Sequence, residues 1–75
     1  MSRHVEVEFV NRNLALVRGY GTRELLTELT GRPPVREVRS RAWVTTPDRA
    51  RSLVALLEYR GVKDIAVINA AQVDA

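Results

Sequence analysis

The sequence predicts an α/β (α+β) two-layer sandwich, in which a mixed sheet of three to four strands carries two helices on one face. Residues 4–10 alternate between apolar and polar types, which is the period of a half-buried strand. Residues 47–60 have apolar side chains at helical spacing, with a proline at the start and a glycine just beyond the end. Residues 65–68 are apolar throughout, which is typical of a central strand covered on both faces. The expected element order is ββαβαβ, in a single domain of residues 1–75.

The amino-terminal segment predicts a β-hairpin over residues 4–18. Val5, Val7 and Phe9 share one side of the first strand. The asparagines that follow suit a tight turn, and a second apolar segment begins at Leu14. The alternative is a short helix over residues 13–18, since Leu, Ala and Arg are good helix formers.

A short helix is expected after the break at residues 19–21. Thr22 is the expected N-cap, and Glu24 lies in the first turn, where the helix dipole favours an acid. Gly31 and the two prolines that follow Arg32 end the helix. Its apolar stripe consists of Leu25, Leu26 and Leu29.

Residues 35–46 are expected to form one long extended segment. The helix after it should be capped by Thr46, begin at Pro47 and end before Gly61. A strand–helix–strand unit of this kind is expected to be parallel, so residues 38–45 and 64–68 should pair or lie next to each other. Alternation places Val38, Ser40, Ala42 and Val44 on a face beneath the helices, and Glu37, Arg39, Arg41, Trp43 and Thr45 on the open face.

The residue inventory argues against catalysis. The chain has no cysteine and one histidine, His4, so neither an activated nucleophile with its base nor a Cys/His metal cluster is expected. Its carboxylates are scattered, and no glycine-rich phosphate loop is present. We therefore expect a protein that is not an enzyme and that has no metal and no cofactor. Without an apolar segment of spanning length we expect no membrane association, and a cytoplasmic location.

Basic residues are concentrated in the middle of the chain. The whole sequence has 12 basic and 9 acidic residues, and Lys63 is the only lysine. One explanation is selection for guanidinium groups that bind phosphate or carboxylate, and the other is codon usage in a GC-rich genome. Between residues 32 and 51, two acids, Glu37 and Asp48, face six arginines, Arg32, Arg36, Arg39, Arg41, Arg49 and Arg51.

The pattern Arg39-x-Arg41-x-Trp43 is the one group of residues in the sequence whose chemistry suits the binding of a ligand. Side chains two residues apart on a strand share a face, so two guanidinium groups and an indole could bind phosphates while a base stacks on Trp43. In the alternative, Trp43 covers an edge of the core and the arginines are solvated or paired with acids. The candidate residues for binding nucleic acid or another partner are Arg36, Arg39, Arg41, Trp43, Arg49 and Arg51.

Three stretches, TRELLTELTGRPPV from Thr22, RSRAWVTT from Arg39 and DRARSLVALLEYRG from Asp48, together resemble small uncharacterised proteins of actinobacterial phages. The resemblance covers about residues 22–61 and leaves out the amino-terminal hairpin. It implies a phage origin and a host cytoplasmic location. It implies no activity for any residue.

Together these observations predict a small binding protein without catalytic activity. DNA or RNA is the first expected partner, bound through the arginine and tryptophan strand face. The alternatives are a host protein, or self-association into a homodimer through the exposed sheet face or an edge strand.

Overall fold

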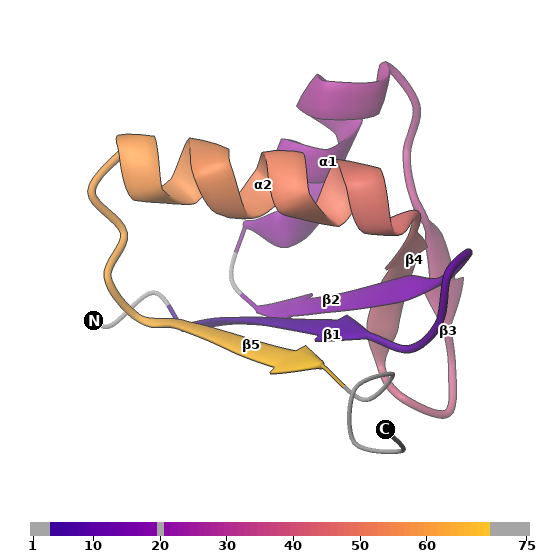
Figure 1. Cartoon of the computed structure of the whole chain (residues 1–75). Coiled ribbons are helices and arrows are strands. Elements are labelled where there is room, and N and C mark those ends of the chain that lie inside the picture. The colour runs from indigo at the N-terminus through magenta and orange to yellow at the C-terminus, as the bar shows by residue number, and fades with distance from the viewer. Residues whose placement is uncertain (1–3, 20, 70–75) are drawn as a thin grey trace.

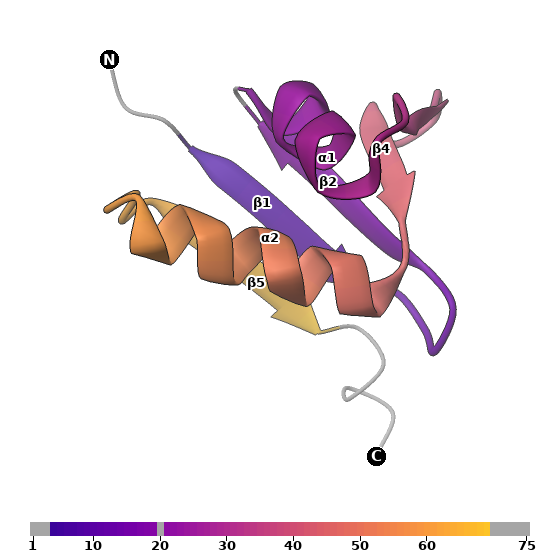
Figure 2. The ribbon, with the colours of Figure 1, turned by 90° about the horizontal axis from the view of Figure 1, so that it is seen from above.

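The computed structural model describes residues 4–19 and 21–69 of the chain. Figure 1 shows two helices lying on one side of a mixed sheet of five strands, whose order across the sheet is β3-β4-β2-β1-β5. Seen from the helix side, α1 lies toward β4 and α2 toward β5 (Figure 2). The elements are β1 (Val5–Phe9), β2 (Ala15–Gly19), α1 (Thr22–Thr30), β3 (Val35–Glu37), β4 (Ala42–Thr45), α2 (Pro47–Tyr59) and β5 (Ile65–Asn69).

The α+β class and the placement of both helices on one face are confirmed, but the strand count and element order are corrected to ββαββαβ. The expected long strand is divided by a turn at residues 38–41 into the antiparallel pair β3 and β4. The Glu37 carboxylate accepts hydrogen bonds from the N–H groups of Arg39, at 3.2 Å, and Ser40, at 3.0 Å. Arg41 takes a left-handed φ of 51°, which completes the reversal.

The expectation that the strands before and after α2 lie next to each other in the sheet is wrong. β4 and β5 run in the same direction in one sheet, but the hairpin of β1 and β2 lies between them. That hairpin supplies the most deeply buried strand side chains, so it takes the centre of the sheet. The expectation that β5 is a central, doubly covered strand is wrong for the same reason. It is an edge strand, and its last three residues are exposed.

The amino-terminal hairpin is confirmed, and the helical alternative over residues 13–18 is wrong. β1 and β2 pair antiparallel from Val5 opposite Gly19 to Phe9 opposite Ala15. The Asn13 N–H donates to the side-chain oxygen of Asn11 at 2.8 Å, so the asparagines close the turn through a side-chain hydrogen bond.

Both helices begin and end with local signals, one of which differs from expectation. α2 is capped as expected, since the Thr46 hydroxyl accepts from the Arg49 N–H at 3.3 Å and Pro47 takes the first position. For α1 the N-cap is Gly21 and not Thr22. Thr22 is fully buried, and its hydroxyl donates instead to the Gly19 carbonyl oxygen at 2.9 Å.

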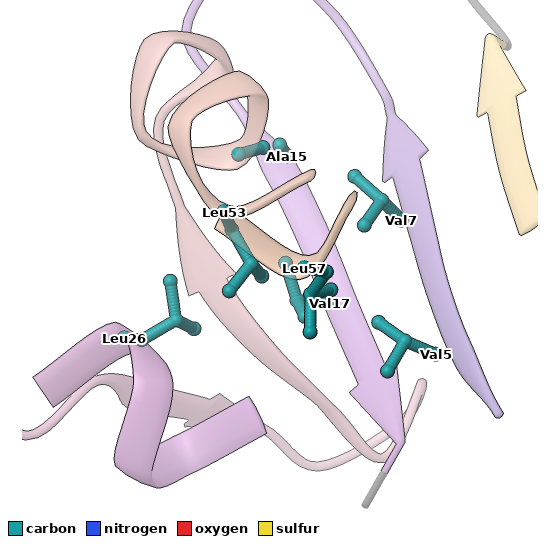
Figure 3. Packing of buried hydrophobic residues seen from close by; sticks show 8 residues of the cluster. Val5, Val7, Ala15, Val17, Leu26, Leu53 and Leu57 are labelled. Carbon is teal, nitrogen blue, oxygen red and sulfur yellow. The ribbon is translucent and has the colours of Figure 1, made fainter. Parts of the chain in front are cut away.

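The core lies between the helices and the helix-facing side of the central strands (Figure 3). Of the expected α1 stripe, Leu26 is fully buried, Leu25 packs at the edge of the core and Leu29 is 38% exposed. Neither helix of the described part of the chain has the length and apolar character needed to cross a bilayer. The buried cluster consists of Val5, Val7, Ala15, Val17, Leu26, Ala50, Leu53 and Leu57.

Candidate nucleic-acid interface

Trp43 lies on the helix-covered face of the sheet, which is opposite to the expectation. In the register of β2 and β4, Trp43 stands directly across from Val17 and Thr45 from Ala15. Directly opposed residues share a face, and Val17 and Ala15 are both core residues. The indole packs partly buried against that core. The alternation within β4 is as expected, but its register with β2 puts Trp43 and Thr45 on the helix-covered face.

The expected stripe of Arg39, Arg41 and Trp43 on one strand face does not form. Arg39 and Arg41 lie in the exposed turn between β3 and β4, outside either strand. The partner of Trp43 across the strands is instead Arg36 of β3. The central carbon of the Arg36 guanidinium lies 5.3 Å from the centroid of the Trp43 ring, which is cation–π geometry.

The open face of the sheet carries an ion-pair network and not a basic surface. The Arg18 guanidinium donates to Glu6 at 2.7 Å and to Glu8 at 3.2 Å. Its Nε group also donates to the Ser40 carbonyl oxygen at 2.9 Å. All three charged side chains are about three-quarters buried. Because two carboxylates surround one guanidinium, this face does not attract phosphate.

Five arginines without a carboxylate partner lie on β3, in the segments on either side of β3, and at the start of α2. No described Asp or Glu side chain lies within ion-pair distance of their guanidinium groups, whereas Arg18, Arg51 and Arg60 are each paired. One follows α1, one is on β3, two are in the turn after β3, and one is in the first turn of α2. We call this set the arginine edge, and it consists of Arg32, Arg36, Arg39, Arg41 and Arg49.

Glu37 is the only acidic residue between Arg32 and Asp48, and its carboxylate is turned into the chain. The Ser40 side chain, followed by the Arg39 N–H, holds the pKa of Glu37 below the usual range of a glutamate. The carboxylate is ionised at neutral pH, and each of its two oxygens accepts one hydrogen bond from the turn. Glu37 thus fixes the turn that carries Arg39 and Arg41.

A cavity of about 390 Å³ lies where the arginine edge meets the helices, with Arg32 and Arg49 in its wall. This volume lies within the range of about 300–1,000 Å³ that is usual for ligand pockets. The amino terminus of α2 adds little to it, because Pro47 has no N–H group and the Arg49 N–H is already bonded to Thr46. An anion here would therefore depend on the two guanidinium groups. The cavity is otherwise lined by Leu26, Thr30, Pro33, Pro34, Val35, Val44 and Thr45, with no acidic residue.

Of the six candidate residues, the structure sets Arg36 against Trp43 and places Arg51 apart from the arginine edge. Arg36, Arg39, Arg41 and Arg49 belong to the arginine edge, while Trp43 lies beneath Arg36. Arg51 points to the other side of α2, where it binds Asp48 at 2.6 Å and lies 5.8 Å from the centroid of the Phe9 ring. Arg32 was missing from the candidates, because its place in the loop after Gly31 gives no signal of where it points.

No family model matches this chain, nor does any curated protein sequence or solved structure. Within residues 4–19 and 21–69, no three carboxylate or imidazole groups gather in a way that could hold a metal ion.

Proposed function

We propose that this chain is a small binding protein, without catalytic activity, that holds the phosphate backbone of nucleic acid through the arginine edge. One observation carries the proposal: all five arginines between residues 32 and 49 lack a carboxylate partner among the described residues, whereas Arg18, Arg51 and Arg60 are paired. The other described cations without an ion pair, Arg12, Arg23 and Lys63, are far apart in the sequence. A planar guanidinium donates two parallel hydrogen bonds to a phosphate, which suits arginine to this role.

The fold already holds several of these arginines in place, so binding a partner would cost less conformational entropy. The Arg36 guanidinium is already stacked on Trp43, and β3 is held in the sheet by β4. The turn that carries Arg39 and Arg41 is fixed by Glu37. Contacts of guanidinium groups with phosphates position a protein on nucleic acid without reading its bases. We therefore propose binding that depends little on sequence and strongly on salt.

We further propose a phage origin and action in the host cytoplasm, both of which rest on the resemblance of residues 22–61 to phage proteins. That segment contains the whole arginine edge. A host protein with an acidic surface is the alternative partner, because carboxylates bind the same guanidinium groups.

Removing two charges from the arginine edge should weaken binding far more than removing two charges elsewhere. For Arg39→Gln/Arg41→Gln we expect the dissociation constant for duplex DNA at low salt to rise at least about tenfold, because hydrogen bonds to charged groups are worth about 1.5–3 kcal/mol each. The matched control is Arg23→Gln/Lys63→Gln, which makes the same change of charge on α1 and before β5. Fluorescence anisotropy of a labelled duplex measures both.

Equal weakening by the two double variants would mean that only net charge matters, and would contradict the arginine edge as the interface. Absence of DNA and RNA binding by the unaltered protein at low salt would contradict nucleic-acid binding itself. If the protein then captured one host protein from nuclease-treated lysate, and Arg39→Gln/Arg41→Gln abolished that capture, the alternative partner would be supported.

A further inference from the structure

The two edges of the sheet differ in how they are protected. β3 has three residues, two of them charged, and follows two prolines, which are devices that prevent pairing with another strand. β5 has five residues, Ile65–Asn69, with no charge and no proline. Val67 and Ile68 are 53% and 41% exposed on its two faces. No strand of the described residues pairs with the outer side of β5, so its backbone is available for another strand.

A groove on the helix side of β5 continues this edge. Its volume is about 320 Å³, and its floor is apolar, formed by Phe9, Val54, Ala55 and Val67. Two opposite charges, Arg51 and Glu58, complete its lining.

The two charges stand at opposite ends of the groove. The Arg51 guanidinium lies over the ring of Phe9, which pairs with Asn69, so it marks the end where β5 finishes. Glu58 lies two helical turns later, close to the point where the chain leaves α2 and returns toward the start of β5.

We propose that two copies of this chain associate along β5, antiparallel, about a two-fold axis that passes through Val67 perpendicular to the sheet. Val67 then faces Val67 of the second copy, and Ala66 faces Ile68 of the second copy. The two sheets become one continuous sheet with all helices on the same face. This inference is independent of the proposed binding of nucleic acid.

The charges of the groove select a second copy as the occupant. A two-fold axis exchanges the two ends of the groove, so Arg51 of each copy, which also binds Asp48 of its own chain at 2.6 Å, meets Glu58 of the other. The strand between them is uncharged, so the two copies do not repel each other there. A 75-residue chain has a small core, and burying a second apolar surface adds the stability that such a core lacks.

The dimer is tested first by sedimentation equilibrium with substitutions at β5. The unaltered chain is expected to be dimeric at high micromolar concentration. Val67→Lys places two like charges at the axis, so the dimer dissociation constant should rise at least about tenfold. Val35→Lys makes the same change on the opposite edge strand, at another exposed valine, and should leave the constant unchanged. A monomeric unaltered chain, or equal weakening by both variants, would overturn the proposal.

Exchanging the charges of Arg51 and Glu58 tests the predicted contact between the two copies by the recovery of a dimer as well as by its loss. Arg51→Glu makes both ends of the groove acidic, and Glu58→Arg makes both ends basic, so each variant alone should dimerise weakly. Mixing the two variants should restore a dimer, which is a heterodimer in which opposite charges meet at both ends. Circular dichroism confirms that each variant is folded before mixing. Variants that remain monomeric after mixing would overturn the proposed axis.

Discussion

Replacement of Gly19 with alanine is expected to unfold a large part of the protein. Gly19 has a φ of 128°, which side-chain-bearing residues rarely adopt, and a Cβ there would overlap the His4 carbonyl oxygen and lie 2.9 Å from the Val5 Cα. These are backbone atoms at the start of β1, so they cannot move without disturbing the central pair of strands. Backbone strain and overpacking each typically contribute about 1–3 kcal/mol.

Such a loss is close to the whole stability expected for a chain of this size. At about 0.05–0.15 kcal/mol per residue, a small domain like this one has only several kcal/mol in total. Urea denaturation followed by circular dichroism measures the change. Gly61→Ala is the control, since Gly61 also has a positive φ, of 80°, but no atom lies within 4 Å of its added Cβ. Similar losses in the two variants would show that the contact with β1 is not the cause.

Trp43→Ala is expected to lower the free energy of unfolding by about 3 kcal/mol, at the lower end of the range for buried aromatic residues. The indole packs against the core on the helix-covered face and supports the Arg36 guanidinium. A tryptophan on the open face, as the sequence suggests, would lose only about 1 kcal/mol. The control is Tyr59→Ala, because Tyr59 is 89% exposed and its removal should change stability by less than about 0.5 kcal/mol.

Fluorescence gives an independent reading of the same side chain, because Trp43 is the only tryptophan. We expect emission that is shifted to shorter wavelength and only weakly quenched by acrylamide, a neutral quencher that the nearby arginines do not attract. Emission typical of a fully hydrated indole, together with a small loss of stability in Trp43→Ala, would contradict the helix-covered position.

Elements with a strong local pattern were predictable from the sequence. The amino-terminal hairpin and α2 follow from alternation, a proline at the first helical position and a terminal glycine. The turn between β3 and β4 was not predictable in this way, since residues 38–41 contain neither glycine nor proline. It forms through side-chain hydrogen bonds of Glu37 and a left-handed Arg41. The face on which Trp43 lies is set by the register of β4 with β2.

The order of the strands, and hence the position of β5, depends on contacts far apart in the chain. An apolar strand is typical of the centre of a sheet, and the sequence alone does not distinguish it from an edge that a second copy covers. For the arginines, too, the sequence alone does not show which contacts form between distant residues. Whether a guanidinium is paired depends on register, as when Arg18 meets Glu6 directly across β1 and β2. The composition shows where in the chain the basic residues are concentrated. The tertiary structure decides which of those arginines are paired with a carboxylate.

The most direct test of the arginine edge is the salt dependence of DNA binding. If about four arginines contact phosphates of duplex DNA, the logarithm of the association constant should fall with the logarithm of salt concentration at a slope of about −3.6. For Arg39→Gln/Arg41→Gln the slope should shrink to about −1.8, because two phosphate contacts are lost. The control Arg23→Gln/Lys63→Gln should keep the slope of the unaltered protein. A slope near zero for the unaltered protein, or an unchanged slope after the loss of Arg39 and Arg41, would contradict phosphate binding at this edge.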